Sequence, residues 1–269
     1  MHPYAWSADA EALVLVPGLC AAYALALRGY PASRARVLAF VAGQALIVVV
    51  FVTPVETLAL HYLLTAHLLQ NVVLAEWAPL LVVAGLPPAL AERISRGRLS
   101  RTVTNPLVAL PVWLATYYTW HVPAFYDFAL RRPSSVLHLE HLSYLLAGCL
   151  VWWPVVHDVP RRISDGARAV YLFAAFALAS PLGLLLALIP RPVYSFYEHA
   201  PRIWGLSPLA DQQLGGATMA AEQAIVFFCA FAFFLLRFLE EGEPYSAASS
   251  ARTSSTPARQ TSSTSSSGR

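Results

Sequence analysis

The sequence predicts an all-α, polytopic bundle of seven transmembrane helices, with the N-terminus outside and the C-terminus in the cytoplasm. Hydrophobic residues make up 57% of the 269 positions and charged residues only 12%, and the mean hydropathy is +0.55. Soluble domains carry about twice that share of charge. Long uncharged runs recur along the chain, and most basic residues fall between alternate runs. These observations together place the chain in a membrane.

Each predicted span is a predominantly apolar run with few charged residues, close to the length that a bilayer requires, about 20 helical residues for a core of about 30 Å. The first span is the weakest of the predictions, since only Ala12 to Leu27 within it is free of charge. Arginines follow the first and third runs and separate the fifth from the sixth, and a proline ends the fourth after "TWHV". The fifth opens with "HLEH", and the seventh is preceded by "DQQLG". The spans are expected at 10–28, 37–56, 62–86, 106–121, 136–156, 168–189 and 216–239.

Arginines orient the predicted bundle. All 18 basic residues are arginine, and the chain contains no lysine. Fourteen lie on one side of the predicted membrane and four on the other, so the positive-inside rule assigns the richer side to the cytoplasm. The four on the outer side are Arg131, Arg132, Arg191 and Arg202.

Two regions of different composition follow from this reading. Residues 1–242 form the seven-span domain, and residues 243–269, rich in Ser and Thr, are expected to be a disordered cytoplasmic tail. The first residues lack the basic start of a signal peptide, so no cleavage is expected. The arginines of the inner loop 87–105 indicate contact with lipid headgroups, and no nucleic-acid partner is expected. The scattered cysteines, without a CxxC pair, are typical of small core residues.

Histidines cluster near the predicted outer face, where seven of the eight lie. Residues three or four apart on a helix share a face. His138 and His141 therefore project together at the start of the fifth span, on either side of Glu140. In the third span His67, Gln70 and Asn71 share a face, and His121 ends the fourth span.

The seventh span contributes a second polar stripe. Asp211, Gly215, Met219 and Glu222 follow one another at helical spacing, with Gln212 beside Asp211. Gly215 and Gly216 would allow close approach of a neighbouring helix. Imidazole suits copper, zinc or iron, and thioether sulfur selects reduced copper, so a mixed set with a carboxylate favours a copper site. A structural hydrogen-bond network and haem ligation stay open as alternatives.

Five segments together resemble one known family. The segments "AHLLQ", "APLLVVAG", "WHVPAFYDFAL", "HLEHLSYLLAGCLVWWP" and "LADQQLGGATM" are similar, in order and helix position, to those of the CtaG-type seven-span cytochrome c oxidase assembly factors. The resemblance covers about residues 10 to 240. It implies a role in maturing haem–copper oxidases, with copper as the metal handled, in the bacterial plasma membrane.

The resemblance also implies site residues. His67, His121, His138, His141 and Asp211 match the polar signature of the family, with Gln70, Gln212 and Met219 beside them. Together the residues and the resemblance predict a metal site formed by those five residues and Met219, supported by Gln70, Asn71, Glu140, Gln212 and Glu222. The chain departs from the family pattern at Asn71, where a second histidine is common, and at Ala220, where a tryptophan is common.

The expected function is therefore that of a non-enzymatic assembly factor that binds copper at the outer face and supports its insertion into the oxidase. Expected partners are cytochrome c oxidase subunits, membrane lipid and a periplasmic copper donor. A retinal protein is excluded because no lysine is present. A haem-binding membrane cytochrome remains an alternative, since His67 with His138 or His141 would supply two axial ligands. A small-ion or metal transporter is another, because Glu76 and Glu222 lie well inside their spans. The outer loop 190–210 is aromatic, which suits a membrane anchor, a lid or a docking face.

Overall fold

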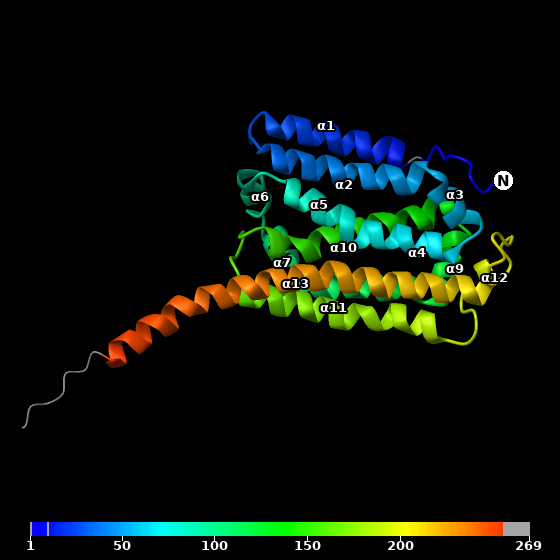
Figure 1. The fold of residues 1–269 in the computed structure, drawn as a ribbon. Helices are drawn as coiled ribbons and strands as arrows, with labels where there is room; N and C mark the ends of the chain where they lie inside the picture. Colours follow the sequence, from blue (N-terminus) through cyan, green and yellow to red (C-terminus); the bar gives the residue numbers. More distant parts are fainter. Residues whose placement is uncertain (1, 10, 255–269) are drawn as a thin grey trace, which may run out of the picture.

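A computed structural model of the chain describes residues 2–9 and 11–254. Every regular element within these ranges is a helix, and the long helices lie side by side along one direction (Figure 1). The first half of the chain contains η1 (Glu11–Leu15), α1 (Val16–Leu27), α2 (Arg34–Val52), α3 (Pro54–His61), α4 (Leu64–Val72), η2 (Val73–Trp77), α5 (Ala78–Gly85), α6 (Pro88–Ile94) and α7 (Arg98–Val103). The second half contains α8 (Pro106–His121), α9 (Pro123–Leu130), η3 (Pro133–Leu137), α10 (His138–Val156), α11 (Asp165–Leu188), α12 (Ser195–Glu198) and α13 (Pro208–Ser254).

Five helical stretches within the described ranges are long and apolar enough to cross a membrane: Arg34–Val52, Leu64–Gly85, Pro133–Val156, Asp165–Leu188 and Pro208–Glu240. The prediction of an all-helical chain with membrane-crossing helices is confirmed at this level. The other two predicted spans are also helices, but shorter ones, Ala12–Leu27 and the 16-residue α8. A helix of 16 residues is about 24 Å long, somewhat less than the hydrocarbon core.

Capping residues explain why the second helix, α2, begins and ends earlier than the predicted span 37–56. It begins at Arg34 because Ser33 caps it, accepting a hydrogen bond from the Arg36 amide at 3.4 Å. It ends at Val52 rather than at residue 56, because Thr53 is extended and Pro54 starts α3. The chain therefore turns within the predicted span 37–56 and delivers Glu56 to the neighbourhood of α4.

Glycines allow the closest helix contacts in the bundle. A Cβ atom at Gly148 of α10 would lie 2.4 Å from the Ala75 carbonyl oxygen in η2. A Cβ atom at Gly216 of α13 would lie 2.6 Å from the Gly183 carbonyl oxygen in α11. Backbones this close leave no room for a side chain, which is the packing that small residues permit in membranes. The predicted close approach at Gly216 is confirmed.

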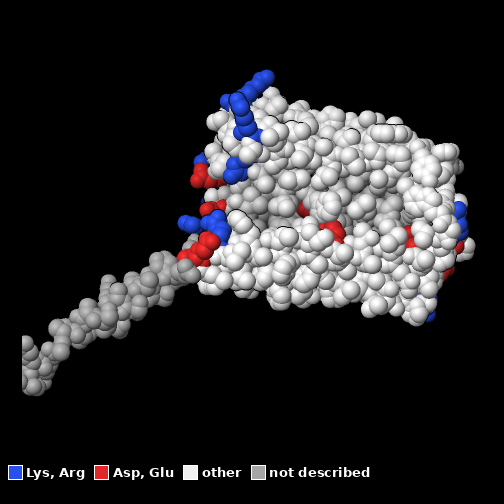
Figure 2. Space-filling model, in the orientation of Figure 1, with Lys and Arg blue, Asp and Glu red and all other residues white. Residues whose placement is uncertain are grey.

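Charged side chains gather at the two ends of the molecule, and the flank between them is almost free of charge (Figure 2). At the end where α1 meets α2, Arg36 donates hydrogen bonds to the carbonyl oxygens of Ala84 and Leu86 at 2.9 and 2.7 Å. Leucine, valine and phenylalanine side chains are exposed along the flank, Leu188 and Val170 among them. An apolar exterior between two polar ends suits a lipid bilayer.

The predicted tail falls partly within helix α13. This helix continues to Ser254, past residue 243 where the tail was expected to start. Each further helical residue adds a backbone hydrogen bond without needing tertiary packing, so a helix can extend beyond its bundle. Residues 255–269 lie outside the described ranges, and the division into a membrane domain and a tail stays a prediction.

Candidate functional site

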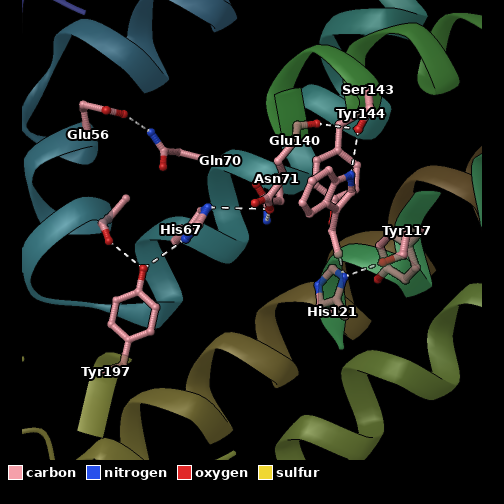
Figure 3. Close-up of polar contacts among 12 residues, drawn as sticks. Glu56, His67, Gln70, Asn71, Tyr117, His121, Glu140, Ser143, Tyr144 and Tyr197 are labelled. Carbon is pink, nitrogen blue, oxygen red and sulfur yellow. Dashed lines mark hydrogen bonds and ion pairs between the residues drawn. The ribbon is translucent and has the colours of Figure 1, made fainter. Parts of the chain in front are cut away.

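Buried polar side chains from four helices meet near the end of the bundle where α8 ends and α4 and α10 begin, and Figure 3 shows His67, His121 and Glu140 among them. His67 comes from α4, His121 from α8, Tyr126 from α9 and His141 from α10, and each is at most 5% exposed. Ring centroids are 6.1 Å apart for His67 and His141, 5.1 Å for His67 and Tyr126, and 6.0 Å for His121 and Tyr126. The structure therefore brings together three of the predicted histidines around a tyrosine. We call His67, His121, Tyr126, Glu140 and His141 the histidine cluster.

Hydrogen bonds fix the tautomer of His67. The Tyr197 hydroxyl donates to the Ala59 carbonyl oxygen at 2.6 Å, and the same hydroxyl lies 3.0 Å from His67 Nδ1. Because its only hydrogen is used toward Ala59, the hydroxyl accepts from His67, so Nδ1 carries the proton. Nε2 then presents a lone pair, and this buried atom has no hydrogen-bond partner among the described residues.

His121 has the same tautomer for a similar reason. Its Nδ1 lies 2.7 Å from the Tyr117 carbonyl oxygen, one turn earlier on α8. A carbonyl can only accept, so Nδ1–H donates and Nε2 again presents a lone pair. The Nε2 atom of His121 is buried and receives no hydrogen bond from the described part of the chain. A histidine whose one nitrogen donates to a carbonyl while the other is bare is oriented as metal-ligating histidines are.

Glu140 supplies the carboxyl group of the cluster. This carboxyl group is fully buried and accepts a hydrogen bond from Asn71 Nδ2 at 3.1 Å. Its Oε1 lies 3.9 Å from His67 Nε2, so a lone pair and a carboxylate oxygen approach each other (Figure 3). A neutral nitrogen lone pair beside a buried carboxyl oxygen suits a metal cation.

The loop 190–210 covers the cluster. Tyr194 donates to the His121 carbonyl oxygen at 3.1 Å, and its ring lies 4.1 Å from that of Tyr126. Tyr197, in the short helix α12, reaches His67 as described. Burial raises the pKa of Tyr197 well above its ordinary value, so the hydroxyl stays protonated at physiological pH. Of the three roles left open for this loop, the contacts favour the lid.

His138 lies at the edge of the cluster, in the wall of an apolar pocket. The pocket has a volume of about 410 Å³ and opens between η1, α2 and α10. His138 and His141 are its polar lining residues, beside Val14, Leu15, Phe51, Leu74, Leu142 and Leu145. The predicted common face of His138 and His141 is therefore present, but His138 is only half-buried.

Asp211 has a different position from the one expected of a ligand. One carboxylate oxygen accepts from the Leu64 amide at 2.8 Å, and the other from the Thr65 amide at 3.0 Å and the Thr65 hydroxyl at 2.8 Å. These groups form the N-terminus of α4, which has no cap of its own. Asp211 thus caps α4 from helix α13 and fixes the helix that carries His67.

The remaining predicted residues also act as connectors. Gln70 donates to the Val50 carbonyl oxygen at 2.7 Å and to Glu56 at 2.5 Å. Gln212 accepts from the Val193 amide at 2.8 Å and so holds the outer loop to α13. Met219 is buried where α13 packs closely on α11.

The described residues contain no set of three or more His, Cys, Asp or Glu side chains already arranged to hold a metal ion. The predicted ligand set of His67, His121, His138, His141, Asp211 and Met219 therefore stays a prediction. The structure joins three of its members with Glu140 and gives Asp211 the role of a helix cap.

Comparison with known proteins decides the family. The profile described as cytochrome c oxidase caa3 assembly factor matches residues 19–241, most of the chain. The chain belongs to this family. An uncharacterized protein of Mycobacterium bovis and one of Mycobacterium tuberculosis are each 25% identical to the caa3 assembly factor chain over 234 residues. One of Mycobacterium leprae is 23% identical over 179 residues.

The caa3 assembly factor chain spans only part of these curated relatives. The M. bovis and M. tuberculosis matches cover 77% of this chain but 34% of the relative, and the M. leprae match covers 57% and 26%. No solved structure matches the chain. The resemblance noted in the sequence is thus confirmed at the level of the family.

Sequence reasoning placed no tyrosine among the candidate site residues, although it allowed the loop that carries Tyr194 and Tyr197 to act as a lid. Tyr126, Tyr144, Tyr194 and Tyr197 are each at most 2% exposed, and Tyr144 lies 3.3 Å from His121 Nδ1. Tyr144 stands three residues after His141, so helical spacing could have found it. Tyr194 and Tyr197 lie in a loop, where no periodicity indicates which side chains turn inward.

Proposed function

We propose that this caa3 assembly factor is a non-enzymatic membrane protein that holds copper, as cargo, at the histidine cluster and supports its delivery to the oxidase. The observation that carries the proposal is the pair of buried Nε2 atoms of His67 and His121, each presenting a lone pair without a hydrogen-bond partner in the described chain. Buried polar atoms are rarely left unsatisfied, and a bound cation would satisfy both. Family membership supports the oxidase as the partner.

Copper fits the donor set better than a hard cation does. The cluster offers imidazole nitrogens with one carboxylate, whereas calcium and magnesium prefer sites built from oxygen. The ring centroids of His67 and His141, 6.1 Å apart, suit two nitrogens on one metal, since each metal–nitrogen bond is about 2 Å. Loading would then need only small side-chain movements.

The proposed setting is the bacterial plasma membrane, crossed seven times, with the N-terminus outside. Most arginines would then face the cytoplasm, and the histidine cluster would lie below the outer surface under the loop 190–210. Copper would come from a periplasmic donor and pass to an oxidase subunit. The chain's contact with lipid follows from its apolar flank.

The experiment compares copper binding with oxidase assembly. The full chain, purified in lipid nanodiscs, is loaded with Cu(I), and bound copper is counted by mass spectrometry. His67→Ala, His141→Ala and the double variant should each lose most of the bound copper, because ligands of one set act as a unit. His199→Ala, an exposed histidine of the outer loop, is the matched control and should bind as the wild type does.

Oxidase activity in cells is measured together with the amounts of the oxidase and of the assembly factor on immunoblots. The cluster variants should lower activity to a similar degree while the assembly factor stays abundant. Unchanged copper binding in the double variant would reject the site, and loss of the protein itself would show that the histidines are structural. A Soret band in the untreated protein would instead favour the haem alternative.

A further inference from the structure

A second buried polar group lies outside the histidine cluster, between η2 and α13. Glu76 is fully buried, and Glu222 is 7% exposed. Trp77 Nε1 donates a hydrogen bond to Glu222 Oε1, and Gln223 Nε2 donates to Glu76 Oε1 at 3.0 Å. The apolar spans Leu64–Gly85 and Pro208–Glu240 contain both carboxyl groups. We call Glu76 and Glu222 the carboxyl pair.

Each carboxyl group of the pair has one oxygen supplied with a donor and one without. Glu76 Oε2 and Glu222 Oε2 are buried and receive no hydrogen bond from the described residues. Trp77, the chain neighbour of Glu76, bonds Glu222, and Gln223, the chain neighbour of Glu222, bonds Glu76, so the two carboxyl groups lie next to each other between η2 and α13. A single proton would therefore satisfy both bare oxygens.

Charge leads to the same conclusion. Among the described residues, no arginine or histidine forms an ion pair with either carboxyl group. Within the described part of the chain, the other titratable group that faces the pair is Tyr117 of α8, whose hydroxyl accepts from Gln223 Nε2 at 2.9 Å. Two negative charges held by neutral donors in an apolar bundle would be very costly.

A proton suits this place better than a metal ion. The bare oxygens are Glu76 Oε2, Glu222 Oε2 and Gln223 Oε1. Three oxygens are too few for calcium or magnesium, which take about six or more, and the site lacks the nitrogen or sulfur that copper prefers. Two carboxyl groups that share a proton are, by contrast, a common arrangement.

The pair is not sealed from its surroundings. Trp77 is only partly buried, and Glu222 keeps 7% of its surface exposed. We propose that Glu76 and Glu222 form a proton-binding site within the membrane-spanning part of the bundle, with one exchangeable proton shared by the two carboxyl groups. This proposal is independent of copper binding.

Infrared spectroscopy of the full chain in nanodiscs tests the proposal through the carbonyl stretching band of protonated carboxyl groups. The wild type should show this band at neutral pH, and the band should shift in D₂O. The part of the band that comes from the pair, measured as the difference between the wild-type and variant spectra, should be lost in both Glu76→Gln and Glu222→Gln, because removing either partner removes the sharing. Glu92→Gln, an exposed carboxyl group, is the control and should keep the band.

Trp77→Phe provides a test that leaves both carboxyl groups in place. Losing the hydrogen bond to Glu222 should make the charged state less favourable, so the band should persist to a pH higher by about one unit. A band that survives in Glu222→Gln would show that the proton is not shared. Absence of the band in the wild type, failure to shift in D₂O, or an unchanged titration in Trp77→Phe would each overturn the proposal.

Discussion

Replacing Asp211 should destabilise the protein without removing its copper. Asp211 accepts hydrogen bonds from the Leu64 amide, the Thr65 amide and the Thr65 hydroxyl, and it is fully buried. The Thr65 hydroxyl also bonds the Asp211 backbone carbonyl oxygen at 2.8 Å, an acceptor that alanine keeps, so the two amide bonds are the main loss. At about 1.5 kcal/mol for each bond to a carboxylate, Asp211→Ala should cost about 3 kcal/mol. That loss corresponds to a melting temperature lower by about 6–12 °C for a chain of this size. Asp211→Asn keeps one acceptor and should lose about half as much.

Thermal unfolding of the purified full chain is measured as the fraction of protein that stays monodisperse after heating to each temperature. Bound copper is counted separately, per folded molecule. Both Asp211 variants should bind copper in the wild-type ratio while melting earlier. The exposed carboxyl variant Glu198→Gln serves as the control for a change of charge on the outer loop. If Asp211→Asn melts as the wild type does but binds less copper, Asp211 is a ligand and the capping argument fails.

Three further predictions concern packing, pH and orientation. Gly148→Ala should lower stability by about 1–3 kcal/mol in thermal unfolding, because its Cβ would clash with the Ala75 carbonyl oxygen; wild-type melting would show that α10 and η2 can separate. Burial lowers the pKa of His157 to about 4 from its ordinary value of 6.5. The neutral imidazole therefore stabilises the fold fully above pH 6.5, and this contribution is lost as the pH falls toward 4. In His157→Gln, the melting temperature should change less with pH between 6.5 and 4. Cysteine labelling from outside should reach Ser134→Cys and not Ser263→Cys, and the reverse pattern would invert the orientation.

The sequence was sufficient for what depends on periodicity. The stripe of Asp211, Gly215, Met219 and Glu222 is buried along its length, and His67, Gln70 and Asn71 share a buried face as helical spacing predicts. Contacts across long sequence separations could not be read in this way. The bond from Leu64 to Asp211 joins residues 147 apart, so nothing local distinguished a helix cap from a ligand.

The positions of the spans could be predicted from the sequence, whereas the inward-facing residues of the loop 190–210 could not. Alternation of apolar and charged runs locates a span, because the bilayer imposes a length on it. The turn at Thr53 and Pro54 has a local signal, the proline itself, but this proline lies inside an apolar run that reads as one continuous span. The inward positions of Tyr194 and Tyr197 depend on where α9 and α4 lie, and only the assembled bundle determines that.

The π-helical segment η2 lies inside the helical stretch Leu64–Gly85 and changes the direction in which the side chains after it point, relative to those before it. A π turn holds about one residue more than an α turn, and each residue of an α-helix advances it by about 100°. On one side of η2, Asn71 faces Glu140 of α10; within η2, Glu76 faces Gln223 of α13. Deleting a single residue from Val73–Trp77 would restore α-helical phase and rotate α5 relative to α4. One continuous helical stretch can therefore contact both α10 and α13. An insertion or deletion at η2 would change the contact of Glu76 with α13 and leave the contact of Asn71 with α10 in place.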